Sequence, residues 1–312
     1  MNASDTLNKI TGQRRRQREF VRWLIGKDHL LGQLVRGCAS FLHLREWLKH
    51  GESRLINANF CKKHLLCPTC AWRRSVKLVS RYTTKAEILA KEHPELIPCM
   101  ITFGPRNGED LLERLHLLKE IIKKMGEAAR KAASNPEKNL PIEWNKILGS
   151  LRSIEVTNKG RGWHVHVHVF ALLSRYVDRE ALSVELMRFS GGECKIVDVR
   201  ACKNGIIAGM CEVIKYALKP GELTNEQTLH VYEQFKGTRM IDPTGLLRGV
   251  LEGDIDQDDL PDLDGPTRDM IAYWLWSSEK FHLRELPPEA VLSRQDEAKF
   301  SCQIAFAQKT EG

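Results

Sequence analysis

The sequence lacks any long apolar segment. No stretch of about 18 apolar residues is present that would span a membrane, and residues 1–20 contain no apolar run of the signal-peptide type. These two absences predict a cytoplasmic protein with no membrane partner. No internal repeat is visible in the sequence either.

A cysteine framework of the secreted type is also missing. The chain has nine cysteines, an odd number, and no secretion signal, which disfavours disulfides and favours reduced thiols or metal ligands. With 42% hydrophobic and 28% charged residues, the composition is that of an ordinary soluble globular protein. At 312 residues, the chain can bury one large core or two modest ones.

The charge is unevenly distributed. Residues 1–90 contain 18 Lys and Arg against 6 Asp and Glu, in a chain with a net charge of +8. A basic N-terminal third indicates a polyanion partner, although a solvated basic face explains the same charge. Residues 252–264 hold seven acids and no base. They read as a solvated loop or linker, because their Gly and Glu spacing differs from that of a calcium loop.

Residues 151–173 predict a β-hairpin. Two runs rich in β-branched residues, 151–157 and 163–173, flank a polar loop that contains glycine. Because side chains alternate along a strand, the second run places three valines on one face and three histidines on the other. The valines are Val165, Val167 and Val169, and the histidines are His164, His166 and His168.

Burial of the valine face fixes the register of this hairpin. Ile154 and Val156 must share that face, which requires an even-numbered loop such as residues 159–162. Glu155 then stands opposite His166, and a carboxylate and two or three imidazoles converge with a cross-strand spacing of about 5 Å. These groups predict a divalent-metal site, with an edge strand of solvated histidines as the alternative. Mn²⁺, Mg²⁺, Zn²⁺, Co²⁺ and Fe²⁺ all stay open, although nitrogen donors disfavour Mg²⁺.

A second metal site is predicted upstream of the hairpin. Cys67 and Cys70 are separated by two residues, so both thiolates reach one tetrahedral ion from a tight turn. Cys61 adds a third thiolate, and the fourth ligand is Cys38 or His64. The spacing favours a structural zinc, and buried free cysteines are the alternative interpretation.

The helix expected after these cysteines has a basic surface. We expect this surface to contact DNA. Its residues are Arg73, Arg74, Lys77 and Arg81.

Residues 205–219 predict an amphipathic helix with a reactive face. Met210, Val213, Ile214, Ala217 and Leu218 fall on its apolar side. Glu212, Tyr216 and Lys219 fall on the other side, so core packing is a weaker explanation for the tyrosine. Lys219 would favour the phenolate of Tyr216, and Glu212 would accept a proton.

The remaining periodicities predict an α+β fold. Strands are expected at residues 97–103 and 196–200, and helices at 30–48, 109–134, 178–189, 224–235 and 270–281. We expect a basic helical region with the cysteine knuckle at 1–90, a core at 91–221 and a mainly helical region at 222–312.

Three motifs resemble those of the plasmid rolling-circle replication initiators of the HUH endonuclease superfamily, in their single-tyrosine group. The histidine motif of that family looks like residues 163–170, its upstream glutamate motif like 153–157 and its tyrosine motif like 212–219. The knuckle at 60–74, with Cys38 as a companion, is also similar. The similarity spans roughly residues 35–250 and is weak between the motifs.

The resemblance implies a central antiparallel sheet of the HUH type and a DNA-nicking activity. Two of the three histidines and Glu155 would hold a divalent metal, Mn²⁺ or Mg²⁺, and the carry-over falls on His166 and His168. Tyr216 would be the nucleophile, and Glu212 would activate water when replication ends. The family also implies structural zinc on the cysteines, origin DNA that is single-stranded at the nick, and host helicase and replication proteins as partners.

Two other classes of function fit part of the sequence. A zinc-containing DNA-binding regulator needs the basic third and the knuckle but no hairpin metal and no exposed Tyr216. A non-haem iron oxygenase uses two histidines and one carboxylate on a β scaffold. The oxygenase leaves Glu212, Tyr216 and the knuckle unexplained.

Overall fold

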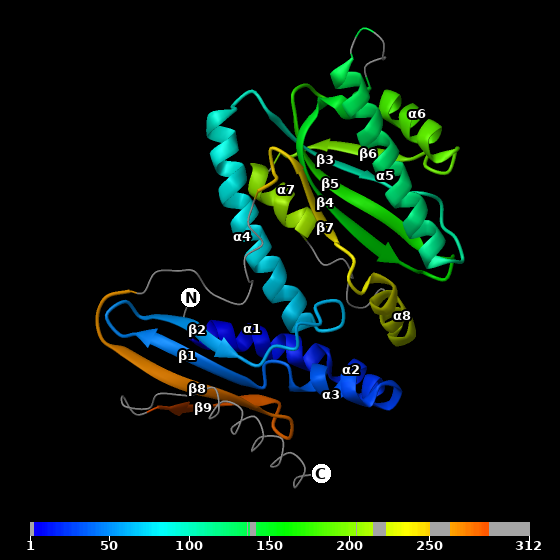
Figure 1. Cartoon of the computed structure of the whole chain (residues 1–312). Helices are drawn as coiled ribbons and strands as arrows, with labels where there is room; N and C mark the ends of the chain where they lie inside the picture. Colours follow the sequence, from blue (N-terminus) through cyan, green and yellow to red (C-terminus); the bar gives the residue numbers. More distant parts are fainter. Residues whose placement is uncertain are drawn as a thin grey trace. The chain divides into compact units, whose positions relative to one another are not determined.

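The computed structural model describes residues 3–135, 137, 142–203, 205–214, 223–249 and 263–286. It contains two antiparallel sheets with helices beside them, so the expected α+β class is confirmed (Figure 1). The chain divides into two compact units. Unit 1 comprises residues 1–73 and 253–312, and unit 2 comprises residues 74–252.

Unit 1 combines three N-terminal helices with a four-stranded sheet. The helices are α1 (Ala3–Arg16), α2 (Arg18–Lys27) and α3 (His29–Gly37). The strands lie in the order β2-β1-β8-β9, with β1 (Phe41–Trp47), β2 (Glu52–Ala58), β8 (Thr267–Leu275) and β9 (Lys280–Glu285). Helix α4 (Pro68–Glu92) begins in unit 1 and crosses into unit 2.

In this unit, two of the helix predictions made from the sequence are wrong. Residues 30–48 form α3 and β1, because the chain turns after Gly37 through Ala39, whose φ is +53°. Residues 270–281 lie in β8 and β9. Within the expected 222–312 region, the described residues therefore contain one helix and three strands.

Charged pairs join β1 to β8 across more than 200 residues of sequence. Arg45 donates two hydrogen bonds to Asp269, at 2.7 and 2.9 Å, and His43 lies 3.1 Å from the same carboxylate. In the next pair, Arg268 donates to Glu46 at 3.0 Å. These partners sit opposite or diagonal to one another in the β1–β8 register, so they favour the strand pairing that periodicity alone did not predict.

Unit 2 is built on a five-stranded sheet in the order β6-β3-β5-β4-β7. Every neighbouring pair is antiparallel. The strands are β3 (Ile97–Phe103), β4 (Ile147–Thr157), β5 (His164–Leu173), β6 (Val197–Ala201) and β7 (Ile241–Gly245). The expected hairpin thus supplies the two middle strands.

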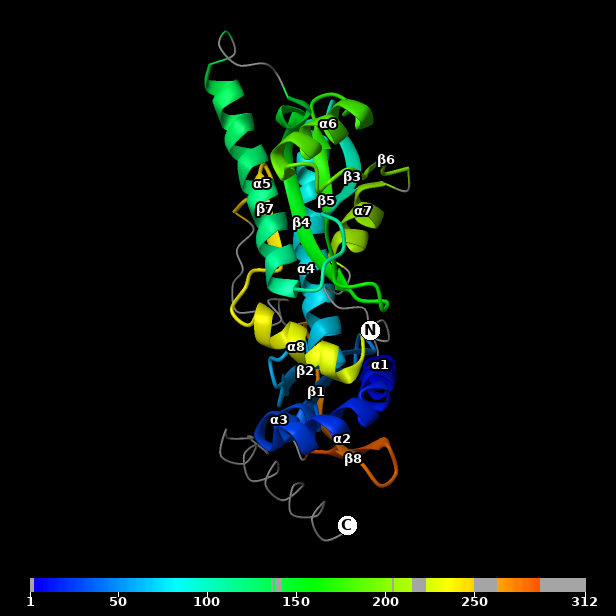
Figure 2. The ribbon, with the colours of Figure 1, turned by 90° about the vertical axis from the view of Figure 1, so that its right-hand side faces the viewer.

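Helices cover both faces of this second sheet. Its helices are α5 (Leu111–Ser134), α6 (Arg179–Ser190), α7 (Gly205–Ile214) and α8 (Asn225–Phe235), with a short 3₁₀ turn at Glu143–Lys146. Figure 2 shows α5 and α7 on opposite sides of the strands. The apolar face of α7 packs in a cluster with Leu151 and Phe170 of the hairpin and with α4.

The approach of α7 to the sheet depends on a glycine. A Cβ added to Gly209 would lie 2.9 Å from Cδ2 of Phe170 and 2.8 Å from Sγ of Cys202. Any larger residue would push α7 away from β5. Gly209 therefore sets how closely the helix that leads to residue 216 lies against the hairpin.

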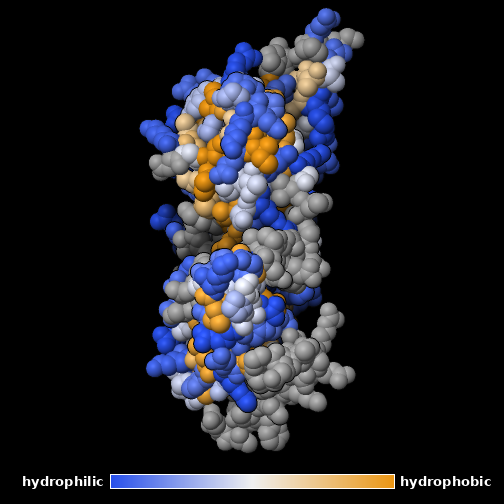
Figure 3. Space-filling model, turned by 90° about the vertical axis from the view of Figure 1, so that its left-hand side faces the viewer, coloured by the Kyte–Doolittle hydropathy of each residue, from blue (hydrophilic) through white to orange (hydrophobic). Residues whose placement is uncertain are grey.

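On the face drawn in Figure 3, hydrophobic residues lie among hydrophilic ones. Among the described residues, no helix combines the length and apolar character needed to cross a membrane.

The β1–β8 charge pair generates a stability prediction. The hydrogen bonds from Arg45 hold the pKa of Asp269 below its usual value. Their stabilisation is therefore present above the unfolded pKa of about 4 and is lost as the pH falls through the folded pKa. Asp269→Asn should lower the free energy of unfolding by about 1–2 kcal/mol at neutral pH, and this difference should vanish in acid.

Urea unfolding followed by tryptophan fluorescence measures this effect, since Trp47 and Trp274 lie in the same sheet. Asp264→Asn is the matched control, because the Asp264 side chain is 71% exposed and should contribute less. An unchanged difference between wild type and Asp269→Asn across the pH range would contradict the assignment.

Candidate metal and nucleic-acid site

The hairpin register expected from the sequence is confirmed. Glu155 pairs with His166, Ile154 with Val167 and Val156 with Val165. The loop between the strands spans residues 158–163, longer than expected but still even in number. Trp163 instead bridges to Gly108, outside the hairpin.

Three of the expected ligands converge on the face opposite the valines. Nε2 of His166 and Nε2 of His168 lie 3.0 and 2.6 Å from Oε2 of Glu155, and the two nitrogens are 3.1 Å apart. Glu155 is buried, with 4% of its surface exposed, and the histidine side chains are 14% and 20% exposed. The group is therefore shielded but accessible from one side.

The orientation of His168 is set by a neighbour that sequence reasoning missed. Thr102 of β3 pairs with His168, and its Oγ1 lies 3.0 Å from Nδ1 of the imidazole. When Nδ1–H of His168 donates to Thr102, Nε2 is unprotonated and its lone pair is directed toward the metal-ligand group. Thr102 lies next to His168 only because β3 and β5 are neighbours in the sheet, so no local sequence pattern predicts this contact.

His164 stands apart from this group. Its Nδ1 lies 2.9 Å from Oδ1 of Asn107, and it is not among the three groups whose ligand atoms converge. Burial, together with the neighbouring His166, lowers the pKa of His164 and favours the neutral ring. The structure thus brings together His166 and His168, and leaves His164 paired with Asn107.

The donor set fits a divalent cation. The ligand atoms of Glu155, His166 and His168 all lie within 4.8 Å of one another. Three acceptor groups that face one point repel one another unless a cation or protons lie between them. Among the described residues, Nδ1 of His166 has no hydrogen-bond partner, so the polar contacts of this imidazole are those of Nε2 with Glu155 and His168.

Helix α7 packs on the same sheet face as these ligands. Leu151 and Phe170, which contact it, share the face of Glu155 and His166 by strand alternation. Met210, Val213 and Ile214 are buried, as their spacing predicted, and Glu212 is on the more exposed side. Oε1 of Glu212 lies 3.9 Å from Nη2 of Arg200. Tyr216 and Lys219 lie outside the described residues.

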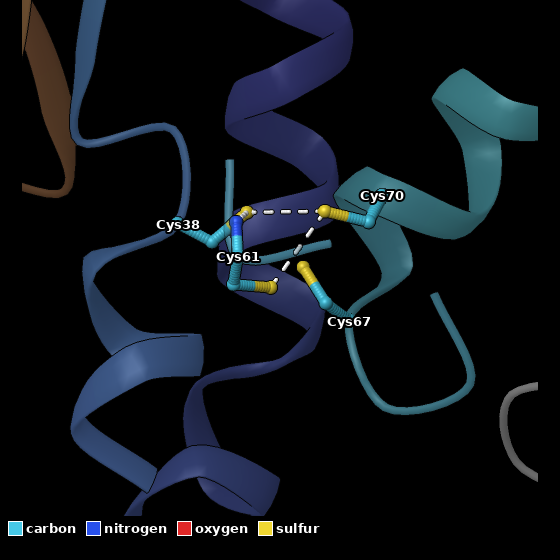
Figure 4. A group of neighbouring side chains, drawn as sticks. All are labelled: Cys38, Cys61, Cys67 and Cys70. Atoms are coloured by element: carbon cyan, nitrogen blue, oxygen red, sulfur yellow. Dashed lines mark hydrogen bonds between the residues drawn. The ribbon is translucent and has the colours of Figure 1, made fainter. Parts of the chain in front are cut away.

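The four cysteines of the knuckle form a second group, within unit 1. Their sulfur atoms point toward one another in Figure 4, with Cys38 and Cys61 lying 3.4 and 3.6 Å from Sγ of Cys70. Cys38 and Cys67 are fully buried, and all four ligand atoms lie within 4.8 Å of one another. Of the two candidates for the fourth position, the structure brings in Cys38 and leaves out His64.

Close packing of the four thiols makes it unfavourable to form more than one thiolate without a cation. Hydrogen bonds with Cys38, Cys61 and Cys70 hold the pKa of Cys67 well below its usual value, whereas hydrogen bonds with Cys61, Cys67 and Cys70 raise the pKa of Cys38. One thiolate is therefore favoured and a second is not. Four thiolates coexist only around a cation, and tetrahedral sulfur coordination is what zinc prefers in structural sites.

The basic residues expected to touch DNA all lie on α4. Arg73, Arg74, Lys77 and Arg81 are half-buried. The Arg73 guanidinium lies 4.0 Å above the ring of Phe60. Part of each side chain therefore packs against the protein.

A basic groove of about 740 Å³ lies on the other face of the unit 2 sheet, between α5 and strands β4 and β7. Asp242 is the acidic residue in its lining, and Arg152 donates a hydrogen bond to it. The groove contains Val167 and Ile154, so it is separated from Glu155 by the thickness of the sheet. Its cations are Lys119, Lys123, Arg130, Arg152, Arg239 and Arg248.

Comparison with known proteins relates the chain to replication proteins. Residues 52–190 match a family model described as "Replication protein". The chain is similar to several proteins named "Protein rep". It is 28% identical to "Protein rep" of Lentilactobacillus hilgardii over 274 residues, which cover 75% of this chain and 82% of that protein.

Other Rep proteins match over similar lengths. The chain is 27% identical to "Protein rep" of Streptococcus pneumoniae over 68% of each chain, and 26% identical to that of Lactiplantibacillus plantarum over 80% of this chain and 87% of the relative. The region that matches the Rep family model includes the hairpin ligands and three of the four clustered cysteines. No solved structure matches the chain with statistical significance.

The thiol cluster predicts a tightly held zinc. Metal analysis of protein purified under reducing conditions should find zinc that survives mild chelation, because four thiolates from one buried cluster hold it. Cys70→Ser should reduce zinc content and stability together. Cys99→Ser is the control, since Cys99 is a buried thiol outside the cluster. Protein that folds normally without any bound zinc would exclude the site.

Proposed function

We propose that this Rep relative is a plasmid rolling-circle replication initiator of the single-tyrosine HUH type. It would nick single-stranded DNA at the plasmid origin and later rejoin the strand, in the cytoplasm with host helicase and replication proteins. The observation that carries the proposal is the convergence of Glu155, His166 and His168 on the sheet face against which α7 packs. Residue 216 follows α7 by two positions.

The hairpin residues would hold a divalent cation, Mn²⁺ or Mg²⁺. Such a cation supplies Lewis-acid stabilisation of charge on a phosphodiester. Glu155 and His168 are rigidly placed for this task, since both lie in the middle strands of the sheet and Thr102 orients the imidazole. Preorganised ligands matter because small displacements of the reacting groups slow the reaction.

The nucleophile would be the phenol oxygen of Tyr216. A phenol of pKa about 10 is mostly protonated at neutral pH, so a nearby cation such as Lys219 is needed to favour the phenolate. Attack on phosphorus forms a phosphotyrosine bond at the 5′ side and breaks the P–O3′ bond. The phenol proton is released to a base, the departing 3′ oxygen takes up a proton, and the resulting 3′-OH primes synthesis.

The other features of the chain support DNA binding in this scheme. A zinc on the thiol cluster would hold the N-terminal helices and the start of α4 in place. The basic residues Arg73, Arg74, Lys77 and Arg81 would then contact phosphates with the parts of their side chains that stay exposed.

The nucleophile assignment predicts the behaviour of Tyr216→Phe. This variant should fold and bind DNA but form no covalent adduct, because the substitution removes only the phenol oxygen. His166→Ala and His168→Ala should lower the rate of nicking, because each removes a metal ligand, with partial recovery at high Mn²⁺. The measurement is adduct formation on an origin oligonucleotide, followed by peptide mapping.

Tyr176→Phe is the matched control for this experiment. Tyr82 and Tyr232 are buried and Tyr273 stacks on His282, whereas Tyr176 is 49% exposed and is thus the accessible competitor. Burial raises the pKa of Tyr176, which makes it a poorer nucleophile. An adduct that persists in Tyr216→Phe, or that maps to Tyr176, would refute the assignment. Wild-type protein that binds origin DNA but never cuts it would favour the alternative function, a non-catalytic zinc-containing DNA-binding regulator.

Glu212 should act in a later step than Tyr216. With one tyrosine in the motif, release of the adduct requires water, and a carboxylate is needed to accept its proton. Glu212→Ala should form the adduct at a normal rate but hydrolyse it about 10²–10⁴-fold more slowly. Single-turnover assays separate the two rates, with Glu226→Ala as an exposed control. A parallel loss of both rates would assign Glu212 to the first step or to folding.

A further inference from the structure

An arginine is buried in unit 1 without enough hydrogen-bond partners. Arg14, in the last turn of α1, has no exposed surface. Its Nη2 donates to the carbonyl oxygen of Arg36 at 3.1 Å, but Nε and Nη1 have no hydrogen-bond partner among the residues that the structure describes. Burying a charge with two unused donors is costly, so a nearby group must compensate.

Two tryptophans supply part of the compensation. The Cζ atom of Arg14 lies 4.9 Å from the ring centroid of Trp274 and 4.8 Å from that of Trp276. Such cation–π contacts stabilise a desolvated guanidinium modestly. The rings do not accept hydrogen bonds in the guanidinium plane from Nε and Nη1, so the charge still lacks an anionic partner.

The thiol cluster lies next to Arg14 in the fold, because the guanidinium donates to the carbonyl oxygen of Arg36, two residues before Cys38, and Gln17, three residues after Arg14, contacts Cys67. Burial lowers the pKa of Arg14 to about 10, while attraction to Cys38, Cys67 and Cys61 opposes this change. Four thiolates around a divalent ion leave a net charge of about −2 in a buried site. The guanidinium of Arg14 would offset part of this negative charge when the metal is bound. Beside four neutral thiols, without the metal, the guanidinium would have no negative charge to offset.

Gln17 provides a second polar contact to the same cluster. Gln17 is 1% exposed, and its Oε1 accepts a hydrogen bond from the S–H of Cys67 at 3.6 Å, while Nε2 has no hydrogen-bond partner within the described part of the chain. The two ends of an amide exchange by rotation about χ3. When Cys67 is a thiolate, the rotated amide donates N–H to the sulfur, so Gln17 matches both states of the cluster.

We propose that Arg14 and Gln17 are positioning residues that tune the metal affinity of the four-cysteine site, Arg14 as its counter-charge and Gln17 as a donor to Cys67. This inference rests on the proposed zinc. It also links the site to β8, because Trp274 and the following Trp276 hold the guanidinium. Helices α1 and α2, drawn in dark blue, pass behind the thiols in Figure 4.

The test measures metal affinity in the full-length chain. Arg14→Met keeps most of the buried volume but removes the charge, and it should weaken zinc binding on the order of 10–100-fold in competition with a chelator. Arg14→Lys keeps the positive charge but not the planar guanidinium, so it should lose less zinc affinity than Arg14→Met. Gln17→Leu should also reduce zinc affinity, but by a smaller factor than Arg14→Met. Arg18→Met is the control, because Arg18 is 51% exposed and pairs with Glu279 instead, so zinc affinity should not change.

Cobalt replacement adds a readout that a purely structural role would not move. Loss of the counter-charge and of N–H donors to sulfur should shift the sulfur-to-cobalt charge-transfer bands to lower energy in Arg14→Met and Gln17→Leu. Chelator-treated Arg14→Met should be at least as stable as chelator-treated wild type, because it no longer buries a cation beside neutral thiols. A structural role would instead destabilise the metal-free and metal-bound forms equally.

Unchanged zinc affinity and an unchanged cobalt spectrum in both variants would overturn the proposal. If Arg14→Met does not fold, the comparison of Arg14→Lys and Gln17→Leu with wild type decides in its place. Failure of the underlying site is distinguishable, since wild-type protein would then bind neither zinc nor cobalt at the cysteines.

Discussion

The buried valine face of β5 is the constraint on which the hairpin site depends. Val165, Val167 and Val169 are fully buried beneath α5, so strand alternation leaves the intervening histidines no other face. The cross-strand register then fixes Glu155 against His166. A slip of one residue would bury imidazoles and expose valines, so the apolar core enforces the geometry of the polar site.

The sequence predicted those features that depend on short-range periodicity. The register of Glu155 with His166, the apolar face of α7 and the cysteine spacing each follow from neighbours within a few residues. Features that depend on strand order were not predictable in the same way. Thr102 reaches His168 only because β3 lies beside β5, and residues 270–273 are in a strand because they pair with β1, which is distant in the sequence.

The two ligand groups differ in how much of each the protein leaves accessible. The thiols offer four ligands within a buried cluster, so an ion there has no position for substrate. The hairpin offers three ligands with partly exposed histidines, so an ion there keeps open positions. A structural role therefore suits the first group, and chemistry on a phosphate suits the second.

The strand order of unit 1 has a consequence for how the chain is made. Strand β1 pairs with β8, and residues 74–252 form a separate unit between them. During synthesis the nascent chain therefore presents all of unit 2 to the cytosol before β8 emerges from the ribosome. Unit 2 is therefore complete first, and strand β1, although translated earlier, remains without its β8 partner until residues 267–275 are made.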